Sequence, residues 1–164
     1  ATLVAHRAQS PVVVVHGTNR HSPDIHRIVV GIDGSECSDE ALRWAVDEAS
    51  RAGAELELVH AWSYPYANGR RGGADPRHEM RVDAMRTLEA AEQLARTWCQ
   101  DVHVHSIVSE DHPAKAIIDA GRSADLVVVG SRGRGGFASL LLGSTSRTVL
   151  QHASVPVALV RHAA

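Results

Sequence analysis

Three glycines in the second half of the chain have a spacing that suits the binding of phosphate. Gly130 and Gly133 are separated by two residues, and Gly143 follows Gly133 after nine more, directly before Ser144. Glycine lets the backbone turn tightly and bring its N–H groups against an anion. A helix that begins at Gly143 and Ser144 would add unpaired N–H donors and the positive end of its dipole. The pattern predicts a phosphate-binding loop, although glycines alone also suit a flexible surface loop.

The residues around these glycines favour the binding interpretation. Thr145 adds a hydroxyl beside that of Ser144, and Arg132 places positive charge within the loop. The loop follows the apolar run of residues 126–129, which is typical of a buried strand. Such a strand would hold the start of the loop in place.

The rest of the chain alternates apolar runs rich in valine and isoleucine with segments of helical period, which is typical of a parallel sheet covered by helices. We expect the strands over residues 28–32, 55–61, 102–108, 126–129 and 155–160, with a loop over 63–78. Loops that follow parallel strands converge beyond the carboxyl edge of the sheet. Asp33, Ala61 and Val129, each near the end of a predicted strand, should therefore meet near the glycines.

The glycine spacing after the fourth strand, the start Ile28 to Ser35 and the end Pro156 to Val160 together resemble the universal stress protein family. The likeness covers about Arg27 to Arg161, most of the chain. It implies an α/β domain with an open five-stranded parallel sheet and helices on both faces, which is Rossmann-like and similar to the adenine nucleotide alpha hydrolases. It also implies a stress-response regulatory protein that binds ATP or another adenine nucleotide, with or without Mg²⁺, and dimerises through its terminal strand.

Carried over by position, the resemblance implies a set of residues that bind the nucleotide: Asp33, Ala61, Val129, Gly130, Arg132, Gly133, Gly143, Ser144 and Thr145. The acidic residue would lie by the nucleotide or its Mg²⁺, although Asp-Gly-Ser is also a common turn that leads into a helix. The chain departs from the family pattern at residues 109–112, where the family often has a glycine. This departure leaves the shape of the neighbouring loop open.

Two function classes remain beside the nucleotide-binding regulator. One is an enzyme on the same architecture that hydrolyses ATP slowly, but we identify no general base and no second loop to stabilise the transition state. The other is a nucleotide-free protein-interaction module, which the intact glycine spacing argues against. We therefore predict a regulatory protein with no catalytic residues and at most weak ATPase activity.

The composition and net charge of the chain argue against nucleic acid and membranes as binding partners. The chain has 164 residues and a formal net charge of −2, so it offers no electrostatic footprint for nucleic acid or an anionic membrane. No apolar run is long enough to span a membrane. The two cysteines form no pairing pattern, which favours a reducing compartment, and we expect a cytoplasmic protein.

Other residues that could do chemistry carry weaker signals. His103 and His105 share one face of a strand but lack further ligands, so we predict no metal site. Cys37, in the first turn of a helix, is expected to be an unreactive thiol, and Trp62 is expected to pack in the core or at the rim of the site.

The N-terminal segment resembles the C-terminal end of the same chain. Pro11 aligns with Pro156, Val12 with Val157 and Val15 with Val160 at one offset of 145 residues, about the length of one domain. We interpret residues 1–24 as the final strand and linker of a preceding copy, and residues 25–164 as one whole domain. The alternative is a chance recurrence of an apolar strand. We also expect this extra strand to pair with the last one, within the chain or between two chains, because a bare apolar edge promotes aggregation.

Overall fold

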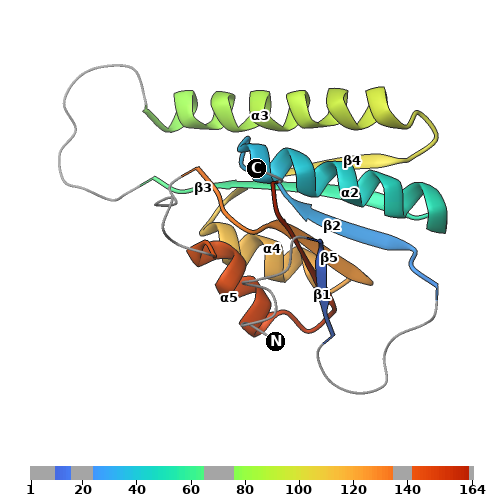
Figure 1. Ribbon diagram of the computed structural model, residues 1–164. Helices are drawn as coiled ribbons and strands as arrows, with labels where there is room; N and C mark the ends of the chain where they lie inside the picture. The colour runs from blue at the N-terminus through green and yellow to red at the C-terminus, as the bar shows by residue number, and fades with distance from the viewer. Residues whose placement is uncertain (1–9, 16–23, 65–75, 135–141, 163–164) are drawn as a thin grey trace.

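The computed structural model describes residues 10–15, 24–64, 76–134 and 142–162, which form one sheet with helices on both faces (Figure 1). The sheet has six strands in the order β1-β6-β5-β2-β3-β4. All neighbours are parallel except β1, which pairs antiparallel with β6. The predicted fold, a five-stranded parallel sheet with an extra N-terminal strand, is confirmed. The strands are β1 (Val12–Val14), β2 (Arg27–Gly31), β3 (Glu55–Trp62), β4 (Val104–Glu110), β5 (Leu126–Gly130) and β6 (Val157–Val160).

Two helices cover each face of the sheet. The helices α2 (Glu36–Ala52) and α3 (Pro76–Trp98) lie on one face, and α4 (Pro113–Gly121) and α5 (Ser144–His152) lie on the other (Figure 1). This arrangement follows from the chain connections, because each crossover between parallel strands must return over a face of the sheet. Within the described residues, no helix is long and apolar enough to cross a membrane.

The interior positions of the central strands β2 and β5 are apolar because both faces of these strands are covered. Val30 and Val128 pack toward α2 and α3, whereas Val29 and Val127 pack toward α4 and α5. All four valines have 0% of their surface exposed. β2 and β5 are therefore held rigidly, and so are the residues at their carboxyl ends.

The helix after β2 begins and ends at residues that carry local signals for a helix terminus. The Ser35 hydroxyl accepts a hydrogen bond from the Ser38 N–H and so caps the first turn of α2. Gly53 ends the helix in the left-handed conformation, with φ of 67°. Both signals are local, which is why they could be found without knowledge of the packing.

Two strands differ by two residues from those expected, and the other three differ by one residue. The third parallel strand runs over Val104–Glu110 instead of 102–108, because Val102 is buried in the turn before the ladder. The last strand begins at Val157, after Pro156, which has no N–H to donate to a neighbour. Part of the expected loop, residues 65–75, lies outside the described residues.

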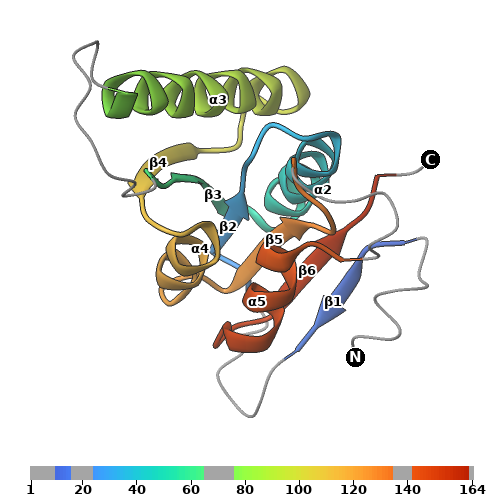
Figure 2. The same ribbon diagram turned by 90° about the vertical axis from the view of Figure 1, so that its left-hand side faces the viewer.

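The direction of the chain connections reverses between β2 and β5. From β2 the chain moves to β3 and β4 on one side, whereas from β5 it moves to β6 on the other. Loops at such a reversal turn away from each other and leave a crevice at the carboxyl edge, where open α/β sheets bind ligands. Figure 2 looks onto this edge of the sheet.

The pairing of the N-terminal strand with the last strand is confirmed. Val12 pairs with Leu159, Val13 with Ala158 and Val14 with Val157, all within one chain. β1 therefore covers the edge of β6 that would otherwise present unpaired N–H and C=O groups (Figure 2).

Deletion of residues 1–16 should therefore change the association state. Without β1, the edge of β6, whose four residues are buried in the intact chain, becomes a template for a strand of another molecule. We expect the truncated chain to form dimers or larger species in light scattering, at a protein concentration where the intact chain does not. An unchanged size and solubility would show that β1 does not protect this edge.

Candidate functional site

A cavity of about 410 Å³ lies at the carboxyl ends of β2, β3 and β5, beside the first turn of α5. All nine residues predicted to bind a ligand line this cavity, although they come from four separate segments of the chain. Its volume is in the range that holds small ligands and cofactors. The nine are Asp33, Ala61, Val129, Gly130, Arg132, Gly133, Gly143, Ser144 and Thr145.

The first turn of α5 points unpaired donors at the cavity. Gly143 is the N-cap residue, and no side chain caps the helix there. Within the described residues, no acceptor takes the backbone N–H of Ser144 or of Thr145. Free N–H groups and the positive end of the helix dipole attract an anion, so this turn can bind phosphate.

Two hydrogen bonds fix α5 against the end of β5. The Ser146 hydroxyl, which is buried, donates to the Gly130 carbonyl at 2.6 Å. The Gly143 N–H donates to the Ser131 carbonyl at 2.8 Å, and this bond closes the glycine loop. Gly143 therefore braces the loop with its N–H, and the donors left for an anion belong to its neighbours.

Asp33 holds the glycine loop from the opposite side. One carboxylate oxygen accepts from the Ser35 N–H at 3.0 Å and from the Ser35 hydroxyl at 2.6 Å. The other accepts from the Arg134 N–H at 3.0 Å. Asp33 thus joins the turn after β2 to the loop after β5, and both of its oxygens are engaged with protein donors.

The close approach of the two loops explains two of the glycines. A Cβ atom at Gly133 would collide with the Asp33 carboxylate, and one at Gly130 would lie 2.7 Å from the Cys37 carbonyl oxygen. At Gly143, by contrast, a Cβ atom would make ordinary contacts at 3.5 Å with Arg132 and Ser131. Packing against these neighbours therefore favours glycine at Gly130 and Gly133, whereas Gly143 leaves room for one methyl group.

Charges of both signs surround the cavity. Arg132 and Arg147 line it, and neither forms an ion pair with a carboxylate of the described residues. Near the start of α2, burial and then the negative charge of Asp33, followed by Glu40 and Glu36, raise the pKa of Asp39. The positive charges of Arg132 and Arg147 are therefore available to a phosphate in the cavity. The acidic side chains of Glu36, Asp39 and Glu40 lie at the start of α2 and do not line the cavity.

Part of the cavity wall was not predicted. Besides the nine residues, apolar side chains from the end of β2, from β3, from α4 and from the segment before α5 line the cavity. Gly31, Ser38, Ser146 and Arg147 complete the lining. The spacing of residues along the strand and the helix could have predicted two of the apolar residues. Val59 lies two residues before Ala61 and so shares its strand face, and Ile117 follows Pro113 by one helical turn. The apolar members are Ile32, Val59, Pro113, Ile117 and Leu142.

None of the weaker candidates lines this cavity. His103 and His105 are exposed at the far end and outer face of β4, and the described residues hold no group of three metal-ligating side chains. Cys37 is buried. Trp62 is 9% exposed and therefore packs in the core instead of presenting its ring at the rim.

A sheet whose chain connections reverse beside a glycine loop and a helix N-terminus is typical of the doubly wound class of α/β domain. The model of the universal stress protein family matches residues 24–161, and the chain belongs to that family. A universal stress protein of Mycolicibacterium smegmatis is 42% identical over 165 residues, which cover 98% of this chain and 54% of that protein.

Solved structures agree with the assignment. A universal stress protein from Archaeoglobus fulgidus in complex with dAMP is 26% identical, covers 82% of this chain and 97% of its own, and has a TM-score of 0.59. A second, from Archaeoglobus fulgidus DSM 4304, is 26% identical with a TM-score of 0.63, and the match covers 97% of this chain but 52% of that one. The chain likewise spans about half the length of the curated relatives it matches.

Proposed function

We propose that this domain is a regulatory protein of the stress response that binds ATP or another adenine nucleotide at the cavity between β2 and β5. One observation carries the proposal: Ser144 and Thr145, whose N–H groups find no acceptor among the described residues, line the same cavity as Arg132 and Arg147. A family member of known structure binds dAMP, which supports the choice of an adenine nucleotide.

The cavity has a polar and an apolar side, which suits the two ends of a nucleotide. The phosphates would lie over the first turn of α5, where the donors and arginines are. The base would lie against the apolar wall that includes Val59 and Ile117. Ala61 and Val129, at the ends of their strands, would offer backbone groups between these two regions.

We propose that the domain regulates instead of catalysing. Asp33 is the only carboxylate among the described residues that line the cavity, and both of its oxygens already accept hydrogen bonds from the protein. A general base for the attack of water must be free to take a proton. Bound ATP should therefore turn over slowly, through its own Mg²⁺-assisted chemistry, without a residue that acts as base.

The test combines two measurements on the purified protein. Mass spectrometry of the material released by denaturation should identify an adenine nucleotide, and calorimetry with ATP, AMP and cyclic AMP should rank the three. A hydrolysis assay run beside these should give a negligible steady-state rate. Failure of all three ligands to bind would favour a nucleotide-free interaction module. A substantial rate that disappears in a single-residue variant would favour the enzyme.

We further propose that residues 1–24 are the last strand and linker of a preceding copy, and that residues 25–164 are the second domain of a tandem protein. The offset of 145 residues between Pro11 and Pro156 supports this division, as do relatives about twice as long as the chain. β1 would then supply within one polypeptide the strand pairing by which we expect single-domain members to dimerise.

A further inference from the structure

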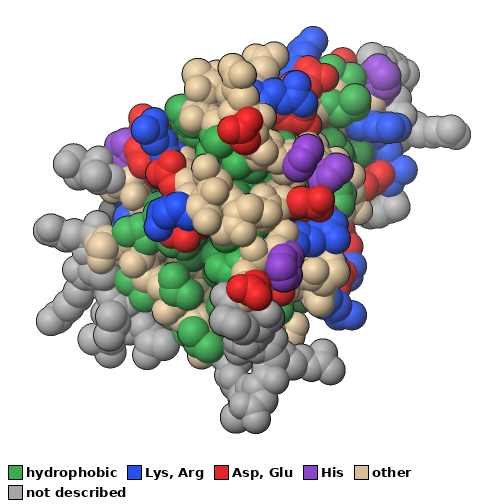
Figure 3. Space-filling view, turned by 90° about the vertical axis from the view of Figure 1, so that its right-hand side faces the viewer, with side chains coloured by type: hydrophobic (Ala, Val, Ile, Leu, Met, Phe, Trp, Pro, Cys, Tyr) green, Lys and Arg blue, Asp and Glu red, His purple; other side chains and the backbone are tan. Residues whose placement is uncertain are grey.

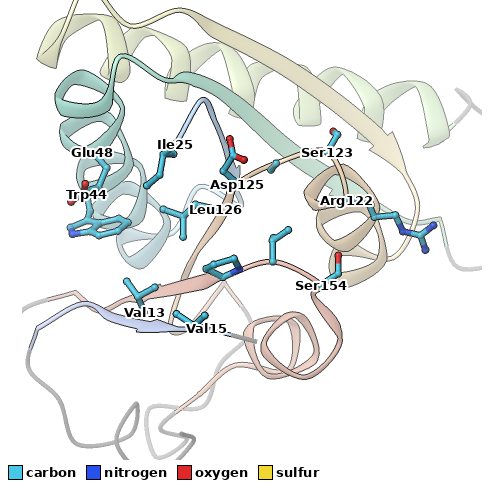
Figure 4. A pocket seen from close by; sticks show the side chains of 13 residues that line it. Val13, Val15, Ile25, Trp44, Glu48, Arg122, Ser123, Asp125, Leu126 and Ser154 are labelled. Carbon is cyan, nitrogen blue, oxygen red and sulfur yellow. The ribbon is translucent and has the colours of Figure 1, made fainter. Parts of the chain in front are cut away.

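A second cavity, of about 590 Å³, lies at the amino ends of the strands, and its charged side chains all have protein partners (Figure 4). Glu48 forms an ion pair with Arg51 at 3.0 Å, and Arg122 forms one with Asp119 at 3.2 Å. The Asp125 carboxylate accepts two backbone N–H groups. Figure 3 looks onto this end of the molecule, where basic and acidic side chains lie next to one another. This cavity therefore leaves little charge for a ligand.

The nucleotide cavity differs, because its two arginines form no ion pair with a carboxylate of the described residues. Arg132 belongs to the glycine loop and is half-buried. Arg147 belongs to the first turn of α5 and is exposed. An exposed side chain that lines a cavity lies at its opening, so Arg147 is placed to meet the outer end of a ligand.

The position of Arg147 on α5 directs its side chain toward the phosphate-binding turn. Arg147 follows Gly143 by four residues, and its N–H donates to the Gly143 carbonyl at 3.0 Å. Residues four apart lie on the same face of a helix, and long side chains point back toward the N-terminus of their helix. We therefore expect the guanidinium to reach back over the turn where Ser144 and Thr145 have N–H groups with no acceptor among the described residues.

Arg147 also conflicts with the dipole of its own helix. A cation in the first turn is unfavourable unless an anion compensates for it, because the dipole is positive there. Arg77 in the first turn of α3 pairs with Glu110 at 3.4 Å, and Lys115 in the first turn of α4 pairs with Asp119 at 3.2 Å. The first turn of α5 holds no acidic residue, and Arg147 has no acidic partner in the described part of the chain. Such local conflicts are expected at functional sites, where a ligand can supply the missing charge.

We infer that Arg147 selects adenine nucleotides that carry a second and a third phosphate over those that carry only one. The inference rests on the proposed nucleotide function and concerns the same cavity. The phosphate nearest the ribose lies over the first turn of α5, and the outer phosphates extend to the Arg147 guanidinium, whose forked N–H groups match phosphate oxygens. A monophosphate or a cyclic nucleotide ends before this side chain, so it gains little from Arg147.

Calorimetry with ATP, ADP, AMP and cyclic AMP, in the presence of a chelator, tests the selection. Arg147→Gln should weaken the binding of ATP and ADP by about fivefold or more, because charge-assisted hydrogen bonds to phosphate are lost. The affinities for AMP and cyclic AMP should stay within about twofold, the size of a weak surface charge effect. Arg147→Lys keeps the charge without the fork and should restore part of the loss. Arg96→Gln on α3 removes the same charge on the other face of the sheet and should change none of the four affinities.

Thermal unfolding of the ligand-free variants separates binding from a structural role. Arg147 has no ion pair to lose within the described residues, and its removal takes a cation away from the positive end of the helix dipole. The melting temperature of Arg147→Gln should therefore stay the same or rise slightly. A fall in melting temperature, with equal weakening of all four ligands, would show that Arg147 supports the fold and does not select the ligand.

Inorganic tripolyphosphate separates this inference from the choice of nucleotide, because it carries phosphates without the base. It should bind the natural protein and bind Arg147→Gln about fivefold or more weakly. Equal losses for ATP and AMP, or no loss for either, would overturn the role of Arg147 and leave the nucleotide proposal standing. Tripolyphosphate binding that depends on Arg147, without binding of any nucleotide, would overturn the adenine assignment but not the role of Arg147. Failure of every nucleotide and of tripolyphosphate to bind would overturn both.

Discussion

Gly143→Val should lower the affinity for ATP by about a hundredfold or more. A Cβ atom at this position already touches Arg132 and Ser131 at 3.5 Å, so the two further methyl groups must push the loop away from α5 or enter the cavity. Either change displaces the N–H groups of Ser144 and Thr145 from the phosphates. The loss of even one hydrogen bond to a charged group is worth about 1.5–3 kcal/mol, and about 1.4 kcal/mol is a factor of ten in affinity.

Calorimetry with ATP gives the measurement, and Gly143→Ala is the matched control. The single methyl group of alanine makes contacts of ordinary length, and the φ of −70° at Gly143 suits any residue. The alanine variant should therefore bind within a few-fold of the natural protein. Unchanged affinity in Gly143→Val would show that phosphates do not lie over this turn.

Asp33→Ala should lower the affinity for ATP by about tenfold or more while the fold persists. The carboxylate joins Ser35 to the N–H of Arg134, and its loss frees the glycine loop from the turn after β2. Three hydrogen bonds to a charged acceptor are lost together, and loop order must then be created at the moment of binding. The hydrophobic core does not include this residue, so circular dichroism should show the native helix content.

The dependence of this loss on Mg²⁺ separates two roles for Asp33. If the carboxylate braces the loop, affinity falls by the same factor with Mg²⁺ and with a chelator. If it holds the metal, as the sequence also suggested, the variant loses the Mg²⁺ dependence that the natural protein shows. Asp33→Asn sharpens the comparison, because its amide oxygen can still accept from Ser35 while its NH₂ group cannot accept from Arg134.

Much of the fold could be predicted because its signals are local. The apolar runs of β2 and β5 indicate strands buried on both faces, and Ser35 and Gly53 mark the ends of α2 through their own side chain and backbone freedom. Boundaries were less certain where a buried residue such as Val102 lies outside the ladder of hydrogen bonds. An apolar run in the sequence indicates that its residues are buried, but it does not indicate which of them form hydrogen bonds with a neighbouring strand.

The sequence by itself determined the family, the fold class and nine of the residues that line the cavity, because glycine spacing and strand periodicity are carried by neighbouring residues. Only the tertiary structure decided which groups remain free. It engages the Asp33 carboxylate with Ser35 and Arg134, uses the Gly143 N–H to close the loop, and leaves Val13 and Val15 uncovered. These outcomes depend on contacts between segments that are distant along the chain, such as Asp33 and Arg134, and such contacts exist only once the sheet has brought the ends of its strands together.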